Sequence, residues 1–450
     1  MTIALTAGLG KFVAELRYED IPQDALSYVH TGFADCVGVM IAGAREAAPQ
    51  LLKAMLAPSG GEATLLFGAD RASALDAAWI NGTAAHALDF DDVAHRGHPS
   101  AVLVPAILAE AEALGASGRQ MVLAYAAGYE TWAELVRRDA DPQHKKGWHP
   151  TGIFGAIGAA AACASLRKLN AGQAACAIAM GASQSAGLVS NFGTMTKPFH
   201  AGRAAHAGVA SARLAGLGFT AALDALEHPP GFLTAVSQGG RIDVESAVEA
   251  GVDWKLPRDR LSVKKYPLCF CTHRALDGML DLLRVERVSP EAVKRVTVSI
   301  SRRAATVLRN HAPQTALEAK FSIEFAMAAA LVAGRAGFAE LTEDFVLRQD
   351  VQALMKRVTV TPDDREDAGG YAIYDQVKIE TGEGRTLDSG QLTRVRGGPD
   401  LPLTRDELWT KFEDCVKAGA ARVPARKLFD ALMSLDRLTN VRGLPGLAAA

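Results

Sequence analysis

Apolar side chains recur at intervals of three and four residues through the first 254 positions, and glycine or proline marks the breaks. This spacing puts the apolar residues on one face of a helix. No alternation of apolar and polar residues persists long enough there to suggest a strand. The pattern therefore predicts helix after helix. The clearest are Ala25–Ile41, Ser73–Leu88, Val102–Leu114, Gly118–Arg138 and Ala201–Ala215.

The pattern changes near Trp254, beyond which short segments rich in β-branched residues predict strands. These segments are 296–300, 358–360 and 376–380, and the strand character continues from 388 to a turn at 399. The apolar run Glu318–Ala333 predicts a helix between them, and Thr404–Ala418 and Ala425–Met433 predict helices after Pro402.

These elements predict a mainly α protein with two domains. Residues 1–254 and 402–450 would form a large all-helical domain, and residues 255–401 a smaller α/β (α+β) domain inserted into it. A chain of 450 residues is long enough for two or three domains.

Two uncharged stretches, 151–166 and 171–196, raise the question of a membrane. The second is long enough to span one, but its polar residues and four glycines favour a buried helix, so we expect no membrane span. The N-terminus becomes charged too soon for a signal peptide. The six cysteines are mostly scattered, and the pair Cys269 and Cys271 suits neither a zinc knuckle nor a CxxC motif. A reduced, cytoplasmic protein is expected.

The charge balance excludes some partners. Lys and Arg total 48 against 50 for Asp and Glu, so the basic excess of a dedicated nucleic-acid binder is absent. The chain has no G-x-x-x-x-G-K-[ST] or G-x-G-x-x-G loop for a nucleotide, and no G-x-S-x-G or H-E-x-x-H motif. A local site for phosphate or carboxylate groups stays open.

Candidate chemistry is densest between residues 86 and 98, where three imidazoles and three carboxylates fall within thirteen residues. His86 and Asp89 are three apart, so they share one helix face, and Gly97–Pro99 ends the helix. Histidine with aspartate suits acid/base catalysis near neutral pH. A metal site built from Asp and His, or a capped helix end with solvated charges, are the alternatives.

Three further clusters combine cations with imidazoles. His149 precedes the uncharged helix at 151–166, where it either faces an anion at the helix start or caps the turn. Lys197, His200 and Arg203 fall within seven residues in a poorly charged setting, which suits substrate carboxylates or ion pairs with protein carboxylates. The segment 264–273 lies at the expected domain junction, where ligand sites are common. Together the clusters indicate a site for a small, multiply anionic molecule.

At these positions the chain resembles the MmgE/PrpD family. The matching segments occur in the family's order and cover most of the chain: HALDFDDVAHRGHPSAVLVPAILA, GWHPTGIFGAIGAA, NFGTMTKPFHAGRAAHAG, KKYPLCFCTH and EAKFSIEFAMAAAL. The resemblance implies a helical domain with a smaller α/β domain, a homodimer, and an enzyme that acts on a small di- or tricarboxylate without a metal or other cofactor. Family members of this kind are 2-methylcitrate dehydratase, cis-aconitate decarboxylase and iminodisuccinate epimerase.

The family's site residues correspond here to Asp89, His98, His149, Lys197 and Lys264. We expect His149 and His98 to act as acid and base, Asp89 to orient a histidine, and Lys197 to serve as a cationic residue of the catalytic site. Four further expectations complete the set: Tyr266 as a proton donor, and Lys264, Arg203 and Asp92 as substrate-binding residues.

The sequence departs from the family at two positions. Val93 stands where many members have threonine, and Phe325 where dehydratases and decarboxylases often have tyrosine. Each change removes a hydroxyl, worth about 1–3 kcal/mol if buried. The first expectation is therefore a dehydratase or an epimerase that abstracts a proton next to a carboxylate. The alternatives are a cis-aconitate-type decarboxylase, a catalytically inactive carboxylate-binding protein, and a metal-dependent lyase that uses the cluster from Asp89 to His98.

Overall fold

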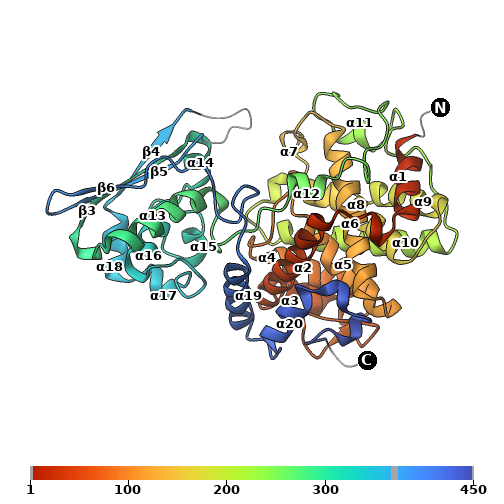
Figure 1. The fold of residues 1–450 in the computed structure, drawn as a ribbon, viewed down its shortest axis with the longest axis horizontal. Helices are drawn as coiled ribbons and strands as arrows, with labels where there is room; N and C mark the ends of the chain where they lie inside the picture. Colours follow the sequence, from red (N-terminus) through yellow and green to blue (C-terminus); the bar gives the residue numbers. More distant parts are fainter. Residues whose placement is uncertain (1–3, 366–372, 448–450) are drawn as a thin grey trace. The chain divides into compact units, whose positions relative to one another are not determined.

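The computed structural model describes residues 4–365 and 373–447, and Figure 1 shows its mainly helical architecture. The chain divides into two units. The helical unit contains Met1–Ser262 and Leu408–Ala450, and the α/β unit contains Val263–Glu407. The predicted fold class, mainly α with a small α/β part, is confirmed.

The division differs by a few residues from the expected boundaries at 254 and 401. Glu130 accepts the backbone N–H groups of Lys255 and Leu256, which fixes the short helix α12 (Lys255–Asp259) to the helical unit. At the other boundary Lys265 pairs with Glu407 at 2.7 Å, so the start of helix α19 (Arg405–Gly419), up to Glu407, stays with the α/β unit.

Apolar helices with many small residues build the helical unit. Its helices are α1 Leu5–Glu15, α2 Gln23–Gly43, α3 Ala47–Leu56, α4 Ala74–Ala87, α5 Pro99–Leu114, α6 Gly118–Arg137, α7 Gln143–Lys146, α8 Pro150–Leu166, α9 Ala171–Ser183, α10 Thr196–Gly216, α11 Phe232–Val236, α12, α19 Arg405–Gly419 and α20 Ala425–Leu432. A two-stranded antiparallel sheet joins β1 (Ala63–Thr64) to β2 (Arg71–Ala72).

Helix α8 forms the centre of this unit, because every residue from Pro150 to Leu166 is buried. It packs against α5, α6, α9 and α10 (Figure 1). Helices α4 and α10 meet with their backbones in contact at Gly82 and Gly202, where a Cβ on Gly82 would lie 2.8 Å from the Gly202 Cα. This close approach brings the C-terminal part of α4 beside the first turns of α10.

One helix in the described part of the chain, α2, is long and apolar enough to cross a membrane. Its apolar window is 78% buried against other parts of the protein, as in a core helix. The two uncharged stretches form α8 and α9, and α9 ends at Ser183, well before Thr196.

The α/β unit is a four-stranded sheet covered by helices on one face (Figure 1). The strands are β3 Val293–Ser301, β4 Val358–Asp363, β5 Gln376–Thr381 and β6 Thr386–Asp388, in the order β4-β3-β5-β6. The β3–β4 pair is parallel and the other pairs are antiparallel. The helices are α13 His273–Glu286, α14 Arg302–Val307, α15 Ala316–Ala319, α16 Ile323–Ala333, α17 Glu343–Val346 and α18 Gln349–Met355.

Two predicted elements differ in detail. The helix expected at 318–333 is split into α15 and α16, because the Ser322 hydroxyl accepts the Phe325 N–H at 3.2 Å and starts a new helix. The strand character expected up to residue 399 stops at Asp388, and beyond it the described residues form isolated bridges, Leu392 with Asp375 and Gly398 with Leu401.

Candidate active site

Two His-Pro pairs place imidazoles at the starts of α5 and α8. His98 precedes Pro99 and His149 precedes Pro150, and each proline is the first residue of its helix. A residue before proline is pushed out of the helical conformation, so both histidines turn away from the helix axis. Neither side chain caps its helix, which leaves both imidazoles for other partners.

The loop from α4 to α5 carries the carboxylates. Asp89 has a left-handed backbone with φ +51°, a conformation that aspartate tolerates better than most residues. The Trp132 indole donates to the His95 carbonyl at 3.2 Å, and Val93 forms two backbone hydrogen bonds with Ser262 at 2.8 and 2.9 Å. These contacts hold the loop, in which Asp91 faces His86 and His98 and Asp89 lies beside His98.

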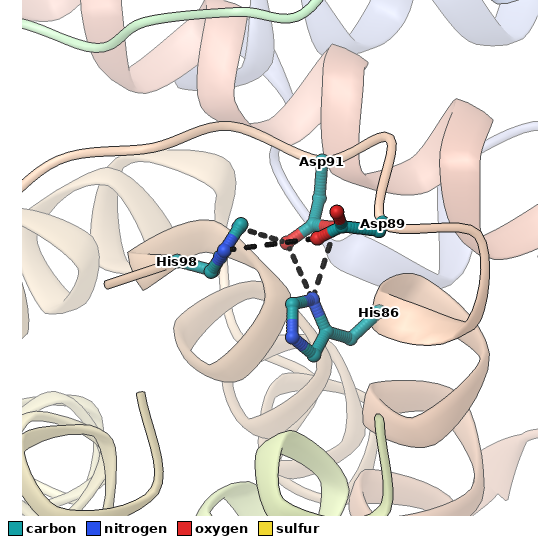
Figure 2. Close-up of side chains that lie close together, drawn as sticks. All are labelled: His86, Asp89, Asp91 and His98. Carbon is teal, nitrogen blue, oxygen red and sulfur yellow. Dashed lines mark hydrogen bonds and ion pairs between the residues drawn. The ribbon is translucent and has the colours of Figure 1, made fainter. Parts of the chain in front are cut away.

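Four of these side chains, His86, Asp89, Asp91 and His98, form what we call the Asp91 cluster (Figure 2). The His86 Nδ1 lies 3.0 Å from both oxygens of Asp91, and the His98 Nδ1 lies 2.9 Å from Oδ2. The His98 Nε2 lies 3.9 Å from Asp89 Oδ1. Because a carboxylate only accepts, the hydrogen bond to Asp91 favours an Nδ1–H on His86 and leaves its Nε2 as the nitrogen with a lone pair.

Burial sets the charges within this cluster. It lowers the pKa of His86 to about 4, so this imidazole is neutral at pH 7. Burial opposes ionisation of Asp91, but the adjacent His86 and His98 outweigh it and hold the pKa of Asp91 well below its ordinary value. The His86 Nε2 is buried and has no hydrogen-bond partner among the described residues. The cluster thus offers an unshared imidazole nitrogen backed by a carboxylate.

Lys197 connects the Asp91 cluster to helix α10. Its Nζ lies 2.6 Å from Asp89 Oδ1 and 5.2 Å from the centre of the Phe192 ring. The lysine expected in the catalytic site, with substrate carboxylates as its expected partners, therefore pairs with Asp89 in this structure. An ammonium group has three donors, so it can bind Asp89 and a second carboxylate together.

His149 and His200 form a second group, which we call the His149 pair. Their Nδ1 atoms lie 3.1 Å apart. The His149 ring stacks on His86 with centroids 5.8 Å apart and meets the edge of Phe192 at 4.8 Å. Burial first, and then nearby His86 and Lys197, lower the pKa of His149; burial and Lys197 lower that of His200. Both rings are neutral at pH 7, and they adjoin the Asp91 cluster.

Two other expected substrate residues have different partners. Asp92 is buried and accepts the Ser100 hydroxyl and, at 3.2 Å, the Ser100 N–H. Burial, with Asp35 nearby, raises the pKa of Asp92 well above its ordinary value. Arg203 contacts His206 and lies 5.3 Å from the centre of the Trp79 ring rather than on the Asp91 cluster. The structure brings neither side chain to the imidazoles described above.

Lys264 and Tyr266 belong to the α/β unit. Lys264 is buried, and the Tyr266 hydroxyl donates to Asp277 at 2.7 Å. Burial and the Asp277 charge raise the pKa of Tyr266, which opposes proton donation. Phe325, one of the two departures from the family, is buried in this unit's core, 6.3 Å from the Phe345 ring.

Three residues of these two groups, His86, Asp91 and His200, belong to the clusters seen in the sequence but were given no individual role there. His86 and Asp91 were visible as members of the first cluster, but nothing in the spacing showed that Asp91 would bind both imidazoles. His200 lies three residues after Lys197 in α10, a spacing that puts both on one helix face. That spacing was the available signal.

The Asp91 cluster also has the composition of a metal site. One ligand atom from each of its four residues lies within 4.8 Å of the others, and mixed histidine and carboxylate ligands suit several divalent transition metals. In this structure Lys197 already pairs with Asp89, and both Nδ1 atoms face Asp91. A cation would have to compete with these contacts.

Comparison with known proteins identifies the family. The model of the MmgE/PrpD N-terminal domain matches residues 7–245, and that of the C-terminal domain matches residues 266–436. Similar proteins include the cis-aconitate decarboxylases of Homo sapiens (27% identical, covering 80% of this chain and 75% of that protein) and Mus musculus (26%, covering 80% and 74%). That of Aspergillus terreus is 23% identical and covers 98% of this chain and 95% of that protein. The chain belongs to the MmgE/PrpD family, whose related members here are lyases.

Proposed function

We propose that this protein is a lyase that removes carbon dioxide from a small unsaturated tricarboxylate, with cis-aconitate as the first candidate. The observation that carries the proposal is the juxtaposition of Lys197, the Asp91 cluster and the His149 pair in the helical unit. The relatives favour this activity, an alternative left open by the sequence, over the dehydratase or epimerase expected first.

The chemistry needs one stabilised carbanion and one proton. When the carboxylate on the methylene carbon of cis-aconitate leaves as carbon dioxide, its bonding electrons shift through the double bond. The negative charge then spreads over an allylic carbon and its attached carboxylate. A fixed cation stabilises this charge, and an acid protonates the carbon to give a methylene-bearing dicarboxylate.

The residues present match these two demands. Lys197 supplies a cation, and its pairing with Asp89 holds the ammonium in place. His149 supplies an imidazole whose pKa is lowered by burial and by positive neighbours. A bound tricarboxylate reverses the local charge, raises the pKa of His149 and lets it carry the proton.

The test is proton NMR of the purified enzyme in D2O with cis-aconitate, citrate, 2-methylcitrate and iminodisuccinate. We expect release of carbon dioxide from cis-aconitate and new methylene signals, with deuterium at the protonated carbon. The matched variant His149→Gln should show none of these changes.

Other results would contradict the proposal in distinct ways. A new alkene from a hydroxy acid without loss of carbon dioxide indicates a dehydratase. Deuterium entry with interconversion of stereoisomers and no new alkene indicates an epimerase. Binding of the carboxylates in calorimetry without any turnover indicates an inactive carboxylate-binding protein.

A homodimer and a cytoplasmic location stay predictions that rest on the family resemblance and the scattered cysteines. Exposed apolar side chains gather in the segment 188–199 beside the His149 pair: Leu188, Phe192, Met195 and Phe199. Covering them with a second copy would bury apolar surface. Light scattering of the wild-type protein should give twice the chain mass of 47.4 kDa, and the Met195→Glu variant should shift toward the monomer.

A further inference from the structure

We propose that His200 is a positioning residue: it engages Nδ1 of His149 and leaves Nε2 as the atom through which His149 transfers a proton. The proposal deepens the proposed function and rests on it for the nature of the reaction. Its structural part concerns the hydrogen bond between the two imidazoles alone.

The backbone at Gly187 lies against both His149 and His200. His149 lies at the start of α8, and its backbone N–H donates to the Gly187 carbonyl at 3.0 Å. Gly187 has φ +128°, and a Cβ there would lie 3.0 Å from His200 Cγ and 3.4 Å from His149 Cβ. The absence of a side chain at Gly187 therefore lets the two imidazoles reach the 3.1 Å separation of their Nδ1 atoms.

The number of protons on the two rings determines the form of the hydrogen bond between the Nδ1 atoms of His149 and His200. The titratable and charged groups that face His149 are His86 on α4, His98 before α5, and Lys197 and His200 on α10. Lys197 also faces His200. Burial and these neighbours keep both rings neutral, so each carries one N–H. A hydrogen bond between two Nδ1 atoms needs one proton between them, so one ring carries Nδ1–H and the other Nε2–H.

His149 uses its Nδ1 for His200 in either arrangement. Its Nε2 has no hydrogen-bond partner among residues 4–365 and 373–447. The nitrogen available to a substrate is therefore Nε2.

The pair then completes the proposed reaction as follows. With the tricarboxylate bound, His149 gains a proton from water at Nε2, and its Nδ1–H donates to Nδ1 of His200. When the bond to the departing carboxylate breaks, the Nε2 proton moves to the carbanion, and the electrons of that N–H bond stay on His149 as a lone pair. His149 is neutral again with its Nδ1–H still held by His200, and water supplies the next proton. One proton is consumed for each carbon dioxide released.

A neutral hydrogen-bond partner at Nδ1 leaves His149 a stronger proton donor than a charged partner would. A carboxylate at this position would stabilise the imidazolium by a full charge, raise the pKa of His149 and weaken it as a donor. An imidazole accepts the same hydrogen bond and orients the ring without that charge.

Two substitutions separate positioning from simple space filling. In His200→Asn the side-chain oxygen occupies nearly the place of Nδ1 and accepts a hydrogen bond, whereas in His200→Leu the volume is similar but no acceptor remains. We expect kcat of the Leu variant to fall about 10- to 100-fold with KM within about twofold, and the alkaline limb of its kcat–pH profile to move to lower pH. The Asn variant should recover kcat to within about threefold of wild type and keep the limb in place.

A readout without turnover completes the test. In protein labelled with ¹⁵N at histidine, NMR should detect a ¹⁵N–¹⁵N coupling across the Nδ1–H···Nδ1 hydrogen bond, lost in His149→Gln and in His200→Leu. Absence of the coupling in active enzyme, or wild-type kcat and pH profile in the folded Leu variant, overturns the role of His200 alone. Absence of turnover of every carboxylate by wild-type protein that shows the coupling overturns the proposed function, and the catalytic role of His200 with it.

Discussion

The histidines of the candidate site fall into two groups that differ in the partner of the Nδ1 atom. In the Asp91 cluster, His86 and His98 turn Nδ1 to a carboxylate, whereas in the His149 pair the partner of Nδ1 is a second imidazole. A carboxylate partner makes the opposite nitrogen more basic, and a neutral partner leaves it more acidic. The two groups therefore differ in the charge that stands against Nδ1, a carboxylate in one and a neutral ring in the other.

The two neighbouring aspartates of the α4–α5 loop show the same principle. Asp91 and Asp92 are both buried and adjacent in sequence, yet their pKa values shift in opposite directions. Asp91 faces two imidazoles, whereas Asp92 faces Ser100 with Asp35 nearby. Burial opposes ionisation of both carboxyl groups, and only at Asp91 do the neighbouring imidazoles outweigh it.

The largest effects should follow from removing the acid or the cation. His149→Gln and Lys197→Met should each lower kcat/KM for the carboxylate substrate about 10²- to 10⁴-fold, because a general acid and a fixed cation act in the transition state. Steady-state kinetics measures this. His228→Gln, at a surface histidine whose side chain is 48% exposed, is the control and should keep wild-type activity. Full activity in both site variants would remove His149 and Lys197 from the site.

Acid pH should destabilise the helical unit through His86. Its pKa is about 4 in the folded protein against an ordinary 6.5. Above pH 6.5 the imidazole is neutral in both states and contributes nothing. Between pH 6.5 and 4 the unfolded chain binds a proton that the folded protein does not, so the free energy of unfolding falls by about 3 kcal/mol. His95 and His206, with pKa values lowered to about 4, add to this loss.

Urea unfolding between pH 4.5 and 7.5 measures this dependence. The His86→Gln variant should lose less stability on acidification than wild type, and His228→Gln should follow the wild-type curve. Asp91 acts in a lower range: its pKa is depressed, so the stability it contributes is lost only as the pH falls below about 4. A wild-type free energy of unfolding that is constant from pH 7 to 4.5 would contradict the assignment.

Replacing Asp91 or Asp92 with asparagine should change the free energy of unfolding by different amounts. An asparagine in place of Asp91 carries no charge and puts an NH2 donor where one carboxylate oxygen stood, so it pairs less well with the two Nδ1 atoms. The free energy of unfolding should fall by about 1–3 kcal/mol, with a loss of activity. Asp92→Asn should cost less than about 1 kcal/mol, because the pKa of Asp92 is already raised and the Ser100 hydroxyl can accept from the new amide. Unfolding curves of both variants measure the difference, and equal losses would refute it.

The smallest effect should come from removing metals. Asp89 is paired with Lys197 and Asp91 with the two imidazoles, so we expect EDTA treatment to leave activity and melting temperature unchanged. Activity lost with the chelator and restored by Zn²⁺, Mn²⁺ or Fe²⁺ would instead support the metal-dependent lyase and a different use of the Asp91 cluster.

Some of the residues predicted from clustering lie together in the folded site and others do not, and helix packing explains the difference. His98, His149, Asp89 and Lys197 come together because Gly82 and Gly202 let α4 and α10 approach, and the His-Pro pairs aim two imidazoles away from their helices. Asp92 is next to Asp91, but its side chain contacts Ser100 instead of the cluster.

The sequence by itself determined the helical pattern, the change of character near Trp254, the family, and the kinds of side chain at the site, because period, composition and motif are local properties. The tertiary structure alone decided which nitrogen of each imidazole is occupied and by what. Some of the site's contacts join residues far apart in the chain, since Lys197 lies 108 residues from Asp89 and His200 lies 51 from His149. Charge depends on partner and burial, and both exist only after the helices have packed.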